Sequence, residues 1–146
     1  MGVIVLSECS YVLKEAKKQY GYARFFASAY KQDVRMWIRR DRNHPCVLLW
    51  SIGNEISDTH IRNDGKETAE HLVAEVNRYD PLRNAQVTFA SNYLAWTPTQ
   101  KVADAIGLVG YNYGEQLYAQ HHREHPTWCI YGSETVSVAA SRGVYH

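Results

Sequence analysis

The chain has 146 residues, and its 16 Lys and Arg residues against 15 Asp and Glu residues give a formal net charge of +1. This length allows one domain with its own core, and a charge so near zero argues against nucleic-acid binding, because phosphate contacts need clustered, uncompensated Lys and Arg. No apolar run approaches the ~20 residues that span a bilayer, and the first residues lack the basic start of a secretory signal, so we expect neither a membrane segment nor a signal peptide.

Apolar and amphipathic stretches alternate through the first half of the chain. A short apolar run over residues 3–6 precedes apolar residues at helical spacing over 25–40, which predict an amphipathic helix. Residues 46–52 form a continuous apolar run, as expected for a strand that is covered on both faces. Asp64-Gly65-Lys66-Glu67 resembles a capping box at the start of a helix, and Asp80-Pro81 ends that helix.

The second half continues this alternation. We expect strands over residues 86–90, 106–111 and 127–131, with one short helix that opens at 97–100 and another over 116–124. Strands that alternate with helices indicate the α/β class, with a parallel sheet and crossover helices. Five strands fit either a small doubly wound sheet or part of a (β/α)8 barrel. Because no Gly-rich phosphate loop follows the first strand, the main argument for a nucleotide-binding open sheet is missing.

Polar side chains follow the predicted strands, at the carboxyl ends where parallel α/β folds place their functional sites. Glu55 and Glu134 are 79 residues apart, about three βα units, so their strands would face each other across a closed barrel. Two converging carboxylates are the arrangement that glycoside hydrolysis requires. On the spacing alone, two ordinary loop glutamates explain the pattern equally well. The strand ends read Ser7-Glu8, Gly53-Asn54-Glu55, Ser91-Asn92, Tyr111-Asn112-Tyr113 and Gly132-Ser133-Glu134.

Three motifs resemble a known family. Arg40-Asp41-Arg42-Asn43-His44-Pro45, followed by Val-Leu-Leu-Trp-Ser-Ile-Gly-Asn-Glu over residues 47–55, closely resembles the acid/base signature of family 2 glycoside hydrolases, the β-galactosidase and β-glucuronidase group. Gly110-Tyr111-Asn112-Tyr113 resembles the sixth-strand motif of that family, and Gly132-Ser133-Glu134-Thr135 resembles its nucleophile motif. Residues 141–145, Ser-Arg-Gly-Val-Tyr, resemble the segment that comes after the nucleophile in many bacterial members.

The resemblance implies a retaining β-glycosidase that hydrolyses terminal β-linked sugars by double displacement, most simply a β-galactosidase. Glu55 would be the general acid/base and Glu134 the nucleophile, with carboxyl groups about 5–5.5 Å apart. Asn54 resembles the contact of the family to the sugar 2-hydroxyl. Tyr113 is the first candidate for the phenol that binds the nucleophile, and Tyr111 is the second.

Several further residues are candidates for the substrate pocket. They are His44, Asn92 and Glu8, although His44 before Pro45 is equally well explained as a residue that fixes the turn into the next strand. Trp96 and Trp128 could stack on the apolar face of a sugar, but burial in the core is the commoner role of tryptophan.

We expect no metal or other cofactor. Large bacterial β-galactosidases hold magnesium with a Glu and a His shortly after the third-strand glutamate, and the corresponding positions here are Val12 and Lys14, which do not suit that ion. Ser7 also stands where the family commonly has an acidic residue. The histidines between 121 and 125 lie away from the strand ends. The three cysteines have no C-x-x-C spacing, so we expect free thiols in the core, which would suit a cytoplasmic location.

The resemblance extends over residues 1–146 as a single, partial catalytic domain, from the third barrel strand to just beyond the seventh. A complete barrel takes ~250 residues, so the sequence is expected to be a fragment of a longer enzyme. Such an open sheet would expose two edges and favour homo-oligomers. One alternative is therefore a truncated, non-catalytic piece. Others are a β-glucuronidase, a β-mannosidase or a related retaining hydrolase acting on β-glucans or β-mannans.

Overall fold

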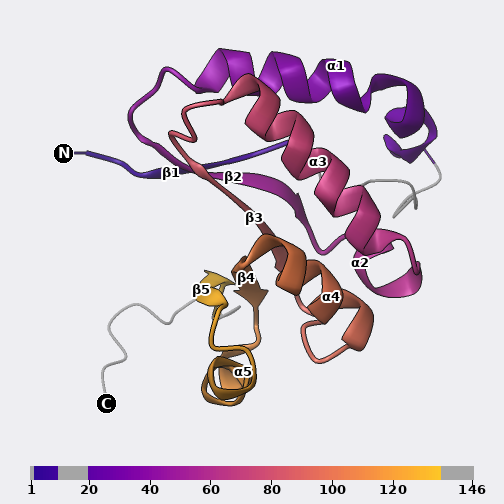
Figure 1. The fold of residues 1–146 in the computed structure, drawn as a ribbon, viewed down its shortest axis with the longest axis vertical. Coiled ribbons are helices and arrows are strands. Elements are labelled where there is room, and N and C mark those ends of the chain that lie inside the picture. Colours follow the sequence, from indigo (N-terminus) through magenta and orange to yellow (C-terminus); the bar gives the residue numbers. More distant parts are fainter. Residues whose placement is uncertain (1, 10–19, 136–146) are drawn as a thin grey trace.

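The five predicted strands form one parallel sheet. The structure, a computed structural model, describes residues 2–9 and 20–135. The strands are hydrogen-bonded in the order β1-β2-β3-β4-β5, all parallel, so each strand lies beside the next one in the chain (Figure 1). A doubly wound sheet reverses its strand order at a switch point, whereas a (β/α)8 barrel keeps sequence order. The order observed is therefore that of part of a barrel, and it confirms the α/β class.

The secondary structure alternates as the sequence predicts. The elements are β1 (Val5–Glu8), α1 (Ala23–Asp41), β2 (Val47–Asn54), α2 (Asp58–Ile61), α3 (Gly65–Tyr79), β3 (Gln86–Ser91), α4 (Thr97–Ile106), β4 (Leu108–Asn112), the 3-10 turn η1 (Glu115–Leu117), α5 (Tyr118–Glu124) and β5 (Cys129–Glu134). Within residues 2–9 and 20–135, no helix is long and apolar enough to cross a membrane.

The boundaries of some elements differ from the predictions. β1 begins at Val5 rather than at residue 3, and it extends to Glu8. The strand expected from residue 106 begins at Leu108, because Gly107 adopts a left-handed φ of 78° and its N–H closes α4 on the carbonyl of Ala103. Asp64 is the N-cap of α3, where the capping-box pattern places it, but its side chain makes no capping hydrogen bond, and its carboxylate accepts one from Arg62 Nε at 2.8 Å.

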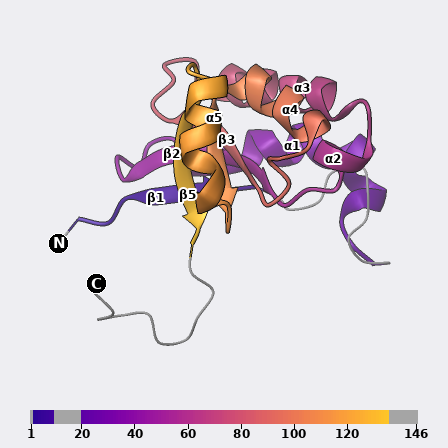
Figure 2. The ribbon, with the colours of Figure 1, turned by 90° about the horizontal axis from the view of Figure 1, so that it is seen from below.

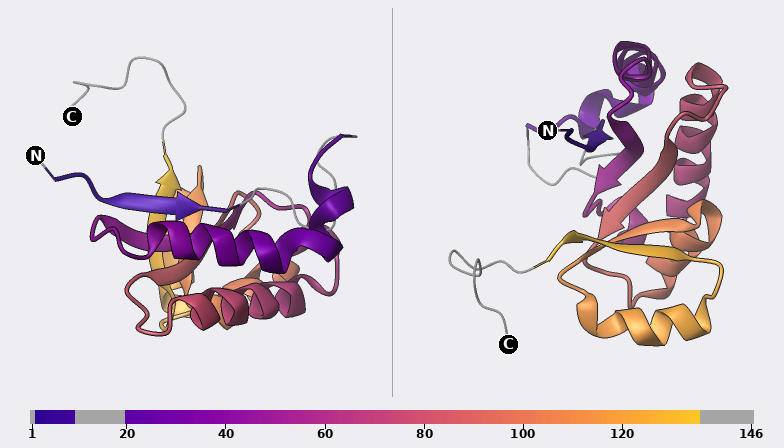
Figure 3. Two further views of the ribbon diagram at one scale, coloured as in Figure 1. Left: turned by 90° about the horizontal axis from the view of Figure 1, so that it is seen from above. Right: turned by 90° about the vertical axis from the view of Figure 1, so that its left-hand side faces the viewer.

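The helices lie on one face of the sheet. α1, α3, α4 and α5 form an arc around it, while no helix of the described residues covers the opposite face (Figure 3). α5 runs alongside β4 and β5 (Figure 2). The core fills the space between sheet and helices, and its centre is Trp50, which meets Trp37 of α1 edge-on at 5.4 Å. Trp50 Nε1 donates to the buried Asp80 carboxylate at 3.0 Å, which ties β2 to the end of α3.

Side chains on the opposite face indicate that the sheet curves. Ser51 on β2 donates to Glu8 on β1 at 2.9 Å, and Thr88 on β3 shares a hydrogen bond with the Tyr131 hydroxyl of β5 at 3.1 Å. Burial raises the pKa of Tyr131, the hydrogen bond from Thr88 opposes this, and the charge of Glu8 raises the pKa further. The hydrogen bond between Thr88 on β3 and Tyr131 on β5 passes over the intervening strand β4, as in the curved wall of a barrel.

Gly110 on β4 makes this crossing possible. A methyl group at Gly110 would lie 2.7 Å from Ser133 Oγ and 2.9 Å from the Tyr131 hydroxyl, so close that these neighbours would have to move. Tyr131 reaches over β4 to Thr88 on β3 only because Gly110 has no side chain.

Replacing Gly110 with alanine is therefore expected to lower the free energy of unfolding by about 1–3 kcal/mol, the usual range for overpacking. Urea unfolding of the full-length protein in which these residues occur measures this change. The double variant Gly110→Ala/Tyr131→Phe lacks the clashing hydroxyl and should recover part of the loss. An unchanged unfolding midpoint in the single variant would contradict the close packing described here.

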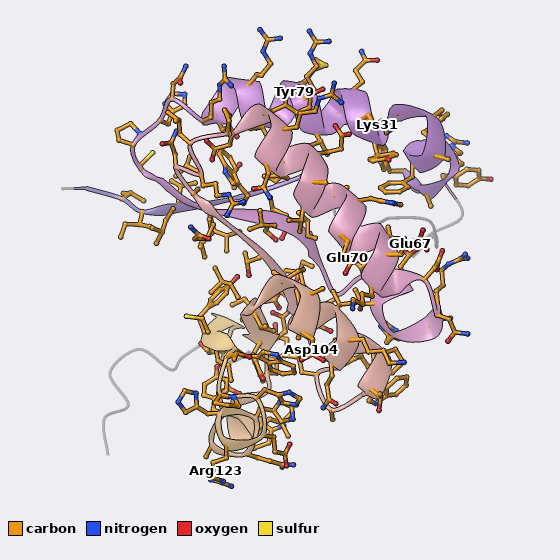
Figure 4. All side chains as sticks on the ribbon, in the orientation of Figure 1. Lys31, Glu67, Glu70, Tyr79, Asp104 and Arg123 are labelled. Atoms are coloured by element: carbon orange, nitrogen blue, oxygen red, sulfur yellow. The ribbon has the colours of Figure 1, made fainter. Side chains whose placement is uncertain are left out.

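The interface between α4 and α5 contains a buried histidine. Tyr111 on β4 shares a 2.9 Å hydrogen bond with Nδ1 of His121, a side chain that is only 2% exposed. Asp104 on α4, labelled in Figure 4, accepts a 3.0 Å hydrogen bond from Trp128 Nε1, just before β5. Burial lowers the pKa of His121 below its usual value of 6.5, with Glu124 opposing the shift and His125 adding to it.

The stability of the protein is expected to fall between pH 7.5 and pH 5.5. The unfolded chain takes up a proton on His121 near its ordinary value of about 6.5, whereas the folded chain does so only at lower pH, so this stability is present above that value and lost below it. His121→Gln can still pair with Tyr111 but does not titrate, and its melting temperature should fall less over this range. The exposed His71 provides the control variant, His71→Gln, and a drop in His121→Gln as large as in the wild type would argue against the assignment.

The expectation that the cysteines are core residues is wrong for Cys46 and Cys129, whereas Cys9 packs against the core. Cys46 and Cys129 are exposed, because each lies at the amino-terminal start of a strand, and Cys9 is half-buried after β1. Burial raises the pKa of the Cys9 thiol to about 11.

Candidate active site

The two glutamates meet at the carboxyl edge of the sheet. Glu55 follows the last residue of β2, and Glu134 is the last residue of β5. Between them β4 ends at Asn112. The strand register shifts between Ser51 and Asn54 and again beside Asn112, and such irregularities commonly re-aim side chains next to active sites.

Asn112 joins the two glutamates. Its side chain is 2% exposed, and its amide nitrogen lies 3.1 Å from Glu55 Oε1 and 3.1 Å from Glu134 Oε1. The same nitrogen donates to Asn54 Oδ1 at 2.7 Å. Since both carboxylate oxygens lie within 3.1 Å of one atom, they are at most twice that distance, 6.2 Å, from each other. The fold therefore brings together two carboxylates from strands that are not neighbours.

Glu134 accepts hydrogen bonds on both of its oxygens. Asn54 Nδ2 donates to Oε1 at 2.9 Å, beside the amide of Asn112, and the Tyr113 hydroxyl donates to Oε2 at 2.6 Å. Ser133 Oγ donates to the side-chain oxygen Oδ1 of Asn112 at 2.7 Å, which turns the Asn112 amide nitrogen toward the carboxylates. Donors to both oxygens fix the orientation of the Glu134 carboxylate and favour its anionic role.

The backbone at this edge is strained at two of these positions. Glu55 and Tyr113 have left-handed φ values of 49° and 53°, and in the described part of the chain Arg83 is the only other residue besides glycine with positive φ. Hydrogen bonds hold both conformations: the Glu55 N–H donates to Ala90 O at 2.9 Å, and the Tyr113 N–H donates to Glu134 O at 2.8 Å. Strain of this kind concentrates at functional sites, where the surrounding structure maintains it.

The other candidate residues lie in different places. Tyr111, the second candidate for the phenol, is fully buried on the helix side of β4 and pairs with His121, so the structure does not bring it to Glu134. Successive residues of a strand point to opposite faces, which is why Tyr111 and Asn112 separate. Burial raises the pKa of Tyr111 to about 12.

His44 lies at the wrong end of β2 for the site. It is an exposed turn residue whose N–H donates to Asp41 O at 3.0 Å before the strand begins, so the structure assigns it the turn rather than the pocket. Glu8 and Asn92 do follow β1 and β3 at the correct edge, and both are exposed. The Glu8 carboxylate accepts a hydrogen bond from Ser51 Oγ of β2 at 2.9 Å.

The first half of the acid/base signature serves the scaffold. Asp41 accepts hydrogen bonds from Arg40 Nε at 2.6 Å and Ser7 Oγ at 2.8 Å, and Arg42 donates to Tyr79 O at 2.6 Å. The Arg40 guanidinium holds the pKa of the Asp41 carboxyl below its usual range, with a smaller contribution from Ser7. These contacts join the end of α1 to β1 and α3, and only the last residues of the motif reach the site.

Sequence reasoning missed Asn112 and Ser133. Asn112 ends a buried strand, so its position was a usable signal, but the sequence does not show that its amide lies between the two carboxylates. The positions compared with a magnesium site, Val12 and Lys14, and the segment 141–145 lie outside the described residues. Within residues 2–9 and 20–135, no group of three or more His, Cys, Asp and Glu side chains is placed to hold a metal ion.

Comparison with known proteins identifies relatives over nearly the whole chain. The chain is 45% identical over 175 aligned residues to the β-galactosidase BoGH2A of Bacteroides ovatus, in a match covering 99% of this chain and 20% of that protein. It is 30% identical over 98 residues to human β-glucuronidase, covering 64% of this chain and 14% of that enzyme. The chain thus spans about a fifth or less of the length of these relatives.

Solved structures agree with this result. The chain superposes on a family 2 glycosyl hydrolase from Bacteroides cellulosilyticus with a TM-score of 0.83 and 31% identity, covering 90% of this chain and 16% of that one. A β-glycosidase from Bacteroides vulgatus gives a TM-score of 0.67 at 26% identity, with the same coverage of 90% and 16%. A family model described as "Glycosyl hydrolases family 2, TIM barrel domain" matches residues 1–133. This chain therefore belongs to glycosyl hydrolase family 2 and contains part of its TIM-barrel domain.

Proposed function

We propose that this site hydrolyses the O-glycosidic bonds of terminal β-linked sugars with retention of configuration. The observation that carries the proposal is the contact of one amide nitrogen, Asn112 Nδ2, with both glutamates at 3.1 Å. The resulting limit of 6.2 Å between those two oxygens supports a retaining enzyme, whose carboxyl groups are about 5–5.5 Å apart, over an inverting one at about 6.5–9.5 Å.

The reaction would proceed in two displacements. In the first, a Glu134 oxygen attacks the anomeric carbon while the glycosidic C–O bond breaks, and Glu55 gives its proton to the departing oxygen, which leaves as an alcohol. In the second, Glu55 takes a proton from water as the water oxygen attacks the anomeric carbon. The ester bond to Glu134 breaks in the same step, and both carboxyl groups return to their starting states.

The surrounding donors would position the nucleophile. Tyr113 holds Glu134 Oε2 at 2.6 Å, and the amides of Asn54 and Asn112 hold Oε1 at 2.9 and 3.1 Å. Before substrate binds, the side-chain amide of Asn54 donates a hydrogen bond to Glu134. A sugar 2-hydroxyl that enters beside it would share that amide, which is the contact that the family resemblance implies for Asn54.

We assign the activity to the full-length protein in which these residues occur. The five strands would correspond to the third to seventh strands of the barrel, and the remaining strands would complete the glycone pocket. The names of the relatives favour galactose as the first sugar to test and glucuronic acid as the second, because the match to BoGH2A is both longer and more identical than the match to human β-glucuronidase.

Mass spectrometry of a trapped intermediate tests the proposal. The full-length protein and the 146-residue chain are each incubated with an activated 2-deoxy-2-fluoro-β-galactoside, and in parallel with the glucuronide and mannoside. We expect a single adduct on the full-length protein, mapped by peptide digestion to Glu134. An adduct on the full-length protein alone would assign the chain as an incomplete, non-catalytic piece, while the absence of an adduct with every sugar would overturn the proposal.

Replacing Asn112 with alanine is expected to lower kcat/KM by about 10²–10³-fold, the usual cost of losing one preorganised donor at an active site. The loss follows because neither glutamate would keep the amide that sets its position relative to the other. Steady-state hydrolysis of an aryl β-galactoside measures it. Asn43→Ala, at an exposed asparagine in the turn before β2, provides the matched control and should leave the rate unchanged. Equal rates in the two variants would exclude a role for Asn112.

A further inference from the structure

Three aromatic side chains form a cluster on the segments that follow β2 and β3 at the carboxyl edge of the sheet. His60 of α2 stacks on Tyr93 with ring centres 3.9 Å apart, and Trp96 meets Tyr93 at 5.1 Å and His60 at 5.7 Å. We call these three residues the aromatic cluster. Trp96 is 51% exposed, in contrast to Trp128, which is 3% exposed and belongs to the core. Core packing therefore accounts for Trp128 but leaves half of Trp96 without a structural role.

The two loops that carry the cluster are the ones that flank Glu55. His60 is five residues beyond Glu55, and Tyr93 is three residues beyond Ala90, whose carbonyl accepts the Glu55 N–H at 2.9 Å. In the sheet, β3 and then β4 separate the Glu55 strand from the Glu134 strand. The cluster therefore belongs to the acid/base side of the site.

The cluster is held rigidly before any ligand binds. The Tyr93 N–H donates to Ser91 Oγ at 3.0 Å, and the Trp96 N–H donates to Tyr93 O at 2.9 Å. Thr99 at the start of α4 donates to Thr59 O of α2 at 3.4 Å, so the two loops are tied to each other. A ring that is already fixed loses little conformational entropy when a ligand stacks on it, which favours binding.

We propose that Trp96, supported by His60 and Tyr93, binds the leaving group of the substrate through the flat apolar face of a sugar or aryl ring. This rests on the proposed function, since the acid/base residue protonates the leaving oxygen and the group attached to that oxygen must lie on its side of the site. The exposed Asn92 lies immediately before Tyr93 in the same loop, four residues from Trp96. An exposed aromatic face with an amide on the same loop suits a sugar ring, which presents C–H groups and hydroxyls together.

The test compares three substrates with the same galactosyl group and different leaving groups. These are an aryl galactoside, a galactosyl disaccharide and galactosyl fluoride, whose leaving group has no face to stack. For Trp96→Ala in the full-length protein we expect kcat/KM to fall about tenfold for the first two and to stay within about twofold for the fluoride. Trp96→Phe should recover most of the loss. A larger loss on one of the two ring-bearing substrates identifies which ring the cluster prefers.

The control is Leu82→Ala, at a side chain that is 82% exposed in the turn between α3 and β3 at the opposite edge of the sheet. It should leave all three rates unchanged. An equal loss on all three substrates in Trp96→Ala would overturn the proposal, because Trp96 would then support the fold or pack against another part of the protein. Wild-type rates on all three would also overturn it.

A binding measurement separates this inference from the proposed function. Phenyl 1-thio-β-galactoside is titrated into the wild type and into Trp96→Phe while tryptophan fluorescence is recorded. A fluorescence change in the wild type that Trp96→Phe lacks supports the cluster as a binding platform even if no glycoside is hydrolysed, and in that case only the proposed activity fails. No change in either protein overturns the platform whatever the activity.

Discussion

Replacing Glu134 with alanine is expected to reduce hydrolysis of an aryl β-galactoside by roughly 10⁵–10⁶-fold, the scale on which removal of a covalent nucleophile acts. Without the carboxylate, no group on this face can form the glycosyl ester. The donors that held it remain: Tyr113 supported Oε2, and the amides of Asn54 and Asn112 supported Oε1. A small anion should occupy the space between them.

Sodium azide provides the decisive measurement. In Glu134→Ala, azide attacks from the side that the nucleophile occupied and should restore turnover with an activated substrate, giving the α-glycosyl azide. The product is identified by NMR. Glu67→Ala, at an exposed glutamate on α3 that Figure 4 labels, is the matched control and should retain wild-type activity. Wild-type turnover in Glu134→Ala, or rescue that gives the β-azide, would remove Glu134 from the nucleophile role.

The sequence predicts the order of elements because each strand contains a short apolar run and each long helix has one apolar face. Both patterns arise because apolar side chains are buried at the regular spacing of a strand or a helix, which can be read from the sequence. The sequence predicts less well where each element begins and ends. α2 has only four residues, Asp58–Ile61, which is too short for a helical period to appear. Gly107 ends α4 through a left-handed conformation, so Ile106 belongs to the helix although its apolar side chain suits the following strand equally well.

The curvature of the sheet depends on a contact that no sequence pattern predicts. Tyr131 on β5 reaches Thr88 on β3 across the gap left by Gly110 on β4. No spacing rule links these three positions, since they lie on three different strands. The motif resemblance predicts a barrel, whereas the contact gives the physical reason that the strands can bend into one.

Within the site, the sequence predicts which strand ends carry the candidate residues. It does not predict which side-chain atoms of those residues contact each other. Glu55 and Glu134 follow from their positions after apolar strands. The choice between Tyr111 and Tyr113 needs the structure, because the left-handed residue at Tyr113 and the register shift beside Asn112 change the direction of each side chain. The sequence does not single out Asn112, yet its amide nitrogen lies 3.1 Å from an oxygen of each carboxylate and so holds the two glutamates near each other.

Replacing Glu55 with glutamine is expected to give a loss that depends on the leaving group. A poor leaving group such as a sugar needs a proton as it departs, so kcat/KM for a disaccharide should fall by about 10²–10⁴-fold, the usual contribution of general acid catalysis. Fluoride departs without a full proton transfer, and kcat/KM for galactosyl fluoride should stay near the wild-type value. Its kcat should still fall, because the second displacement has lost the base that activates water.

Steady-state kinetics over a series of aryl galactosides measures this dependence. In Glu55→Gln, the logarithm of kcat/KM should fall steeply as the phenol becomes less acidic, and in the wild type it should change little. In Glu55→Ala, azide should give the β-glycosyl azide, since it enters on the face that water normally uses. The same loss for every leaving group would mean that Glu55 positions the substrate rather than moving the proton, and the α-azide would exchange the roles of the two glutamates. Because the Glu134 and Glu55 variants predict azides of opposite configuration, one pair of product spectra tests both assignments at once.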